Sequence, residues 1–137
     1  MLKTYNGIVL LRLSLGILFL WFGLLKILPF DSPIENIVGR TFITLSFGYV
    51  TPNVSIPFLG IWECFIAVGF FLGKYMRWVI ILFYIHIIGT FLPLFIFPKE
   101  TWLINPFLPS LLGQYIIKNI VLLAAGKVIK EYDVKIY

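Results

Sequence analysis

The stretch MRWVIILFYIHIIGTFLPLFIF, residues 76–97, decides the class of the fold. After Arg77 it runs for twenty residues without another Asp, Glu, Lys or Arg. A helix needs about 20 mainly apolar residues to cross a hydrocarbon core about 30 Å thick. The length and composition of this stretch therefore predict a membrane-spanning helix.

Three further stretches satisfy the same criterion, at about residues 7–28, 54–73 and 108–129. The whole chain of 137 residues is 61% hydrophobic and has a mean hydropathy of +1.01, far outside the range of soluble domains. The four stretches occupy most of the chain. We therefore predict one all-α membrane domain over residues 1–137, an integral four-helix bundle without a soluble catalytic domain.

A short extra helix is predicted in the first outer loop, over about residues 33–47. Ser32 is suited to cap it, Pro33 to its first position, and Glu35 to reach back toward the cap. Its apolar residues indicate that it lies in the membrane interface or folds back over the bundle. Further along, Pro93 predicts a kink in the third span, and Asn105-Pro106 is suited to start the fourth.

The net charge of +5 does not indicate a nucleic-acid-binding protein, because such a protein needs a clustered basic surface that follows phosphates. Here the basic residues lie at the ends of the predicted spans. The positive-inside rule applied to them predicts a multi-pass protein with both termini in the cytoplasm. The residues that share this side are Lys3, Lys74, Arg77, Lys127, Lys130 and Lys135.

The cysteine and histidine content limits the redox chemistry that the chain itself can provide. Cys64 is the only cysteine and His86 the only histidine. We expect no internal disulfide, no CxxC pair and no metal site, because the ligand spacings that such sites need are missing. A redox role would then use a bound cofactor or a partner subunit.

The first span carries a stripe of polar and small residues. Arg12, Gly16, Phe19, Gly23 and Lys26 are separated by alternating steps of four and three, which keeps them on one helix face. The glycines mark places where another backbone can come close. Arg12 and Lys26 either face the bundle with this stripe or extend to the lipid headgroups.

Polar residues at similar depth on three spans predict a buried cluster. Counted at about 1.5 Å per residue from the outer ends, Glu63, His86 and Lys118 lie about nine to eleven residues deep. Gln114 is one turn from Lys118, and Asn119 follows it. Because an ammonium near the membrane centre needs a partner, we expect a Glu63–Lys118 ion pair. The cluster either holds the helices together, binds a ligand or handles protons, or faces another subunit.

A quinone-type ligand fits such a cluster better than haem or a metal ion. It needs an apolar slot with a few hydrogen-bond donors near its carbonyl groups. His86, Gln114 and Lys118 are such donors, and Phe19, Phe70 and Phe83 are candidate walls, although aromatic residues in membrane helices also serve ordinary packing.

Three segments resemble the DoxX-like family of small four-helix membrane proteins: LRLSLGILFLWFGLLKILP, GIWECFIAVGFFLGKYMR and PSLLGQYIIKNIVLLAAG. The resemblance rests on the stripe of the first span, on Glu63, and on the run Gly113, Gln114, Tyr115, Lys118 and Asn119. It implies a four-helix bundle in the bacterial cytoplasmic membrane, often in or beside redox complexes. The family includes the DoxD-type small subunit of thiosulfate:quinone oxidoreductase, but its members are functionally diverse.

Three functions remain open from the sequence. The chain is a quinone-associated subunit of a membrane redox system, a structural or assembly subunit of a larger membrane complex, or a small transporter. Its expected partners are membrane lipids and either other membrane subunits or further copies of itself, and whether it is an enzyme is left open.

Overall fold

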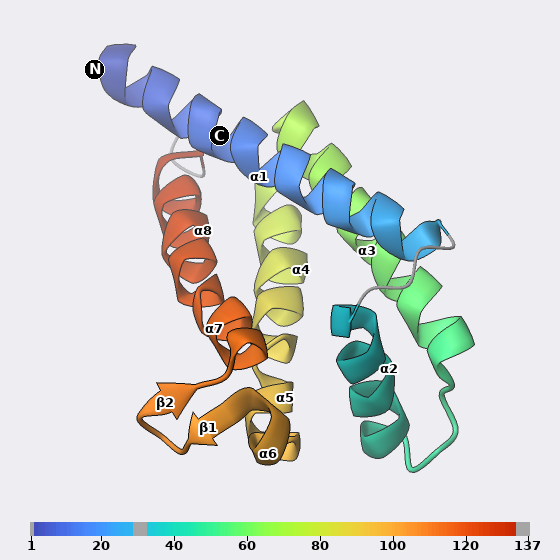
Figure 1. The fold of residues 1–137 in the computed structure, drawn as a ribbon. Coiled ribbons are helices and arrows are strands. Elements are labelled where there is room, and N and C mark those ends of the chain that lie inside the picture. Colours follow the sequence, from blue (N-terminus) through green and yellow to red (C-terminus); the bar gives the residue numbers. More distant parts are fainter. Residues whose placement is uncertain (1, 29–32, 134–137) are drawn as a thin grey trace.

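The computed structural model describes residues 2–28 and 33–133, and it confirms an all-α membrane fold (Figure 1). Four stretches are helical, long and apolar enough to cross a membrane: Tyr5–Ile27, Pro52–Leu72, Met76–Ile96 and Leu111–Tyr132. In chain order the elements are α1 (Leu2–Ile27), α2 (Pro33–Leu45), α3 (Pro52–Leu72), α4 (Met76–Gly89), α5 (Leu92–Ile96), α6 (Pro98–Thr101), β1 (Trp102–Ile104), β2 (Leu108–Pro109), α7 (Leu111–Ile117) and α8 (Asn119–Asp133).

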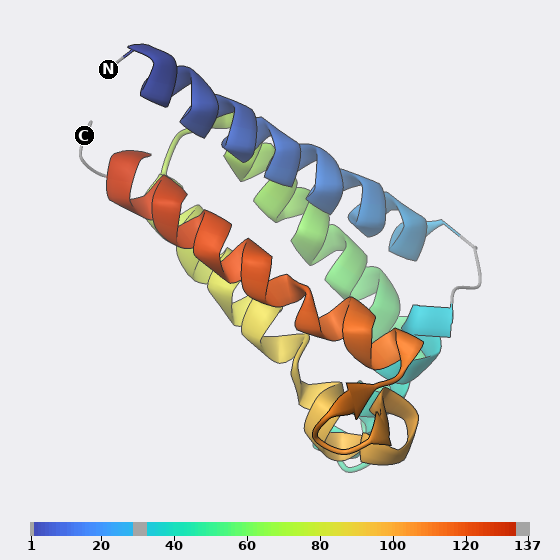
Figure 2. The ribbon, with the colours of Figure 1, turned by 60° about the vertical axis from the view of Figure 1, so that its left-hand side comes forward.

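The four crossings run alongside one another as a bundle (Figure 2). The start of α1 and the end of α8 lie at one end, called here the terminal end. The opposite end, called the distal end, carries α2, α6 and the β1–β2 hairpin. The most extensive helix contact joins α1 to α3, and α8 packs mainly on α4.

Two glycines allow the close contact between α1 and α3. A Cβ atom placed on Gly60 would lie 2.7 Å from the backbone oxygen of Gly23, and one placed on Gly23 would lie 2.8 Å from the oxygen of Gly60. Small residues let membrane helices approach until their backbones touch. At the terminal end of the same contact, the Arg12 guanidinium lies against Gly73, which ends α3 with φ +63°. The stripe predicted on the first span therefore faces α3.

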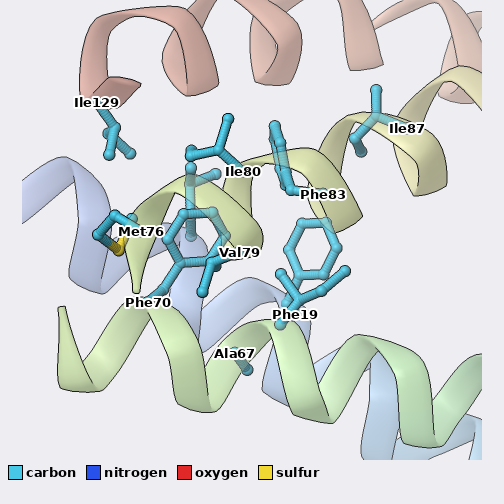
Figure 3. Packing of buried hydrophobic residues seen from close by; sticks show 11 residues of the cluster. Phe19, Ala67, Phe70, Met76, Val79, Ile80, Phe83, Ile87 and Ile129 are labelled. Atoms are coloured by element: carbon cyan, nitrogen blue, oxygen red, sulfur yellow. The ribbon is translucent and has the colours of Figure 1, made fainter. Parts of the chain in front are cut away.

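The apolar core lies mainly between the middle of the bundle and the terminal end. At its centre the rings of Phe19, Phe70 and Phe83 contact one another at tilted or edge-on angles, with centroids 5.4 to 6.3 Å apart (Figure 3). Such arrangements bring the positive edge of one ring toward the negative face of another. The core is completed by Leu15, Ile66, Ala67, Met76, Val79, Ile80, Ile87 and Ile129.

The third and fourth crossings are each interrupted in the part that lies nearer the distal end. Pro93 cannot donate a backbone hydrogen bond, and the third crossing divides into α4 and α5 around Thr90 and Phe91, as the sequence predicted. The fourth divides into α7 and α8 at Lys118. The Asn119 amide donates a hydrogen bond of 2.9 Å to the Thr90 hydroxyl, so a polar contact joins the two interruptions.

The start of the fourth crossing differs from the prediction. The helix begins at Leu111, and Ser110 caps it by accepting a hydrogen bond from the Gly113 amide at 3.1 Å. Asn105-Pro106, expected to start this helix, lies instead between β1 and β2. The antiparallel pairing of these short strands turns the expected outer loop into a hairpin.

An ion pair fastens α2 to α6 at the distal end. The two guanidinium nitrogens of Arg40 donate to the two carboxylate oxygens of Glu100, at 2.8 and 2.6 Å. The guanidinium also lies 4.5 Å from the ring centroid of Phe97. The short helix predicted at about residues 33–47 is thus present as α2, and it packs on α3 and α5 as well as making this contact.

This ion pair predicts a pH-dependent attachment of α2. The hydrogen bonds from Arg40 lower the pKa of the Glu100 carboxyl below its ordinary value of 4.5. A carboxyl whose pKa is lower in the folded than in the unfolded state stabilises the folded state at pH values above its unfolded-state pKa. This contribution is lost as the pH falls through the folded-state pKa. We therefore expect α2 amides to exchange hydrogen more slowly in the parent than in Glu100→Gln above pH 4.5, and the difference to vanish at lower pH. A difference that persisted in acid would contradict this role of the carboxylate.

Candidate functional site

A buried carboxylate shared by two basic side chains lies in the middle of the bundle. The Lys26 ammonium donates to both oxygens of Glu63, at 2.8 and 3.0 Å, and His86 Nε2 lies 3.0 Å from Glu63 Oε1. The side chains of Lys26, Glu63 and His86 are only 12%, 6% and 8% exposed. We call these three residues the triad. It connects three membrane-spanning segments through one carboxylate.

Glu63 and His86 lie near the middle of their own membrane-spanning segments. Glu63 is the twelfth residue of the 21-residue span Pro52–Leu72, and His86 is the eleventh of the 21-residue span Met76–Ile96. α1 reaches this level with its last turn, because its pairing with α3 sets Gly23 against Gly60. The ammonium of Lys26 therefore meets Glu63 near the middle of the second crossing.

The expected ion pair between Glu63 and Lys118 is not formed. Lys118 is exposed, and its ammonium lies 3.7 Å from the ring centroid of Tyr115, one helical turn earlier. Among residues 2–28 and 33–133, no carboxylate lies within ion-pair distance of it. Helical side chains lean toward the helix start, so Lys118 extends along α7 toward the distal end and leaves Glu63 to Lys26.

The other predicted cluster residues make separate contacts. The Gln114 side chain is exposed and donates to the carbonyl of Pro109 at 3.4 Å. Asn119 contacts Thr90 rather than the triad. Of the predicted cluster, the structure brings only Glu63 and His86 into direct contact.

Lys26 faces the bundle, which is one of the two alternatives that the sequence left open for it. Counted from the end of its own helix, it lies close to the headgroups, yet it is the main partner of Glu63. The signal that could have found it is the stripe: Lys26 is seven residues after Phe19, whose ring is in the core. A residue two helical turns away on the same face must also face the bundle.

His86 has a second ring nitrogen that does not take part in the contact with Glu63. His86 Nε2 contacts Glu63, and the ring edge of His86 meets Phe19 with centroids 5.5 Å apart. In the described part of the chain, Nδ1 of His86 has no hydrogen-bond partner. A neutral imidazole presents one donor and one acceptor nitrogen, so it can connect the carboxylate to a group bound on its other side.

Within residues 2–28 and 33–133, no three His, Cys, Asp or Glu side chains lie close enough together to hold a metal ion. Cys64 is a half-buried free thiol beside Gly23. Carboxylate and imidazole groups such as those of Glu63 and His86 can form hydrogen bonds and transfer protons.

Comparison with known proteins places the chain in a family. The sequence model of the DoxX family matches residues 7–97, about two thirds of the chain. The chain belongs to the DoxX family. In this DoxX protein the matched region contains Lys26, Glu63 and His86, whereas the whole fourth crossing lies beyond it. No curated protein and no solved structure matches the chain significantly.

Proposed function

We propose that this DoxX protein binds a quinone-type ligand at the triad and serves as the membrane subunit of a bacterial redox system. The observation that carries the proposal is the Glu63 carboxylate, held by Lys26 and His86 near the middle of the second and third crossings. Ionisable residues at this depth are costly and commonly mark functional sites. We further propose the cytoplasmic membrane as its location, with both termini in the cytoplasm.

The groups beside the triad support a quinone as the ligand. A quinone headgroup needs an apolar surface and a hydrogen-bond partner for its oxygen. The ring of Phe19, which packs against His86, would form part of that surface, and the second ring nitrogen of His86 would meet the oxygen. A bound quinone would supply the redox chemistry, taking up two electrons and two protons on reduction to the quinol. The electrons would come from another subunit of the redox system.

The residues of this chain would manage the protons. His86 holds one nitrogen toward Glu63 and can turn the other toward the ligand oxygen, so a proton can move between ligand and carboxylate through the imidazole. Lys26 keeps a positive charge against the carboxylate and fixes its orientation. Because all three groups are buried, the transfer would proceed away from bulk water.

Quinone retention tests this proposal. The parent protein, Glu63→Gln and His86→Phe would be purified in mild detergent, and extracted quinone would be measured per protein. We expect both variants to lose most of the quinone, by about tenfold if one hydrogen bond to a charged group is worth about 1.5 kcal/mol. Lys118→Gln is the matched control, because Lys118 does not contact the triad. Equal quinone in the parent and in Glu63→Gln would overturn the proposal.

A second function is favoured by the way the triad joins α1, α3 and α4 through one carboxylate. In that case the triad specifies helix packing, and the chain is a structural or assembly subunit of a larger membrane complex. Purified protein would then contain no quinone but would co-purify with defined membrane subunits. A quinone-containing protein without partners would exclude this alternative.

A further inference from the structure

We propose that the β1–β2 hairpin is a lipid anchor, whose tip lies among the acyl chains of the leaflet at the distal end. The hairpin projects sideways from the end of the bundle, on the side away from α2 (Figure 1). This assignment is independent of the triad and of the ligand proposed there.

The composition of the hairpin fits lipid and not water. Residues 102–109, WLINPFLP, contain no charged side chain. Leu103, Ile104 and Phe107 are 70%, 60% and 86% exposed. A contiguous group of large exposed apolar side chains marks a surface that is covered by a partner or a membrane.

The base of the hairpin fixes its direction relative to the bundle. The Ser110 amide donates to the Thr101 carbonyl at 2.9 Å, and the Ser110 hydroxyl donates to the Glu100 carbonyl at 2.6 Å. The indole of Trp102 donates to the Leu94 carbonyl at 3.3 Å. Gly113 approaches the Thr101 carbonyl so closely that a side chain there would collide with it. The exposed tip is therefore held in place by α5 and α7.

Continuity with the membrane-spanning surface identifies lipid as the occupant. Leu111, the first residue of the fourth crossing, is 86% exposed directly after the hairpin. Phe95, in the last turn of the third crossing, is 80% exposed before it. Both belong to segments that contact lipid, so the apolar surface continues from the two crossings onto the hairpin.

A second apolar turn at the same end supports this placement. Phe47 and Tyr49, in the connection from α2 to α3, are also almost fully exposed. Aromatic side chains concentrate where a membrane protein meets the headgroup region. The distal end thus has the composition of a layer embedded at the membrane surface.

Spin labelling of the full-length protein in lipid nanodiscs tests the anchor. A single label would be attached to Phe107→Cys in a Cys64→Ala background, and its accessibility to oxygen and to a water-soluble nickel chelate would be measured. Oxygen concentrates in the acyl chains, whereas the chelate stays in water. Labels at Val121→Cys and Lys74→Cys provide lipid and water references, because both residues are exposed, Val121 within the fourth crossing and Lys74 in the turn between the second and third crossings.

We expect the oxygen-to-chelate ratio at position 107 to be several-fold higher than at position 74 and to approach that at position 121. A ratio equal to that at position 74 would overturn the proposal, because the tip would then lie in water. Protection from both reagents would also overturn it, since a protein surface would then cover the tip. Labelling at exposed positions leaves the core intact, and unchanged circular dichroism would verify the fold of each labelled protein.

Discussion

Replacing Glu63 by alanine is expected to lower the free energy of unfolding by about 3–5 kcal/mol, the usual cost of removing one partner from a buried ion pair. The loss arises because the Lys26 ammonium, only 12% exposed, would remain in the bundle without its carboxylate. His86 would lose its partner in the same substitution. Unfolding in mixed micelles of mild detergent and SDS, followed by circular dichroism, measures the change.

Two controls test whether the effect of Glu63→Ala comes from the unpaired buried charge or from the loss of a side chain. Glu100→Ala removes a carboxylate from an exposed ion pair and should have a much smaller effect. The double variant Lys26→Met with Glu63→Leu removes both charges together and should recover most of the stability lost in Glu63→Ala, because no uncompensated charge is left. An unfolding midpoint of Glu63→Ala equal to that of the parent would show that the triad does not stabilise the bundle.

Gly60→Val is expected to destabilise the protein by about 1–3 kcal/mol, the usual cost of inserting atoms into a tightly packed contact. Its Cβ would lie 2.7 Å from the backbone oxygen of Gly23, and a backbone atom cannot rotate away as a flexible side chain can. α1 would have to move off α3, which would also separate Lys26 from Glu63. The same micelle unfolding assay measures the loss of stability. A loss of retained quinone would report the separation of Lys26 from Glu63.

Gly89→Ala is the matched control for this prediction. Gly89 is the last residue of α4, and a Cβ placed there meets nothing within 4 Å. Alanine should be neutral or stabilise the helix by up to about 1 kcal/mol. If Gly60→Val unfolded at the same point as Gly89→Ala, the close contact between α1 and α3 would not be needed for stability.

Much of the fold could be predicted because the features that determine it lie within single segments of the sequence. A run of apolar residues long enough to cross a membrane predicts a spanning helix by itself, and Pro93 predicts an interruption wherever the helix packs. The hairpin could not be predicted in this way. Its two short strands depend on hydrogen bonds between residues on either side of Asn105-Pro106, and the sequence there equally suits a helix start.

Two of the three triad residues could be predicted for the same reason. Glu63 and His86 lie in the middle of their own spans, so counting along each helix placed them at the same depth. Lys118 was assigned to Glu63 by the same counting, but its side chain extends along its own helix to Tyr115. The depth of a residue along its helix does not predict the direction in which its side chain extends.

The sequence by itself determined the membrane class of this DoxX protein, its four crossings and the helix face that carries Gly23 and Lys26. Only the tertiary structure decided which basic residue meets Glu63. That choice depends on how far α1 is shifted along α3, and the shift is set where the backbones of Gly23 and Gly60 touch. Hydrophobic periodicity specifies which face of a helix is buried but not its position along a neighbour, because that position depends on contacts between distant segments.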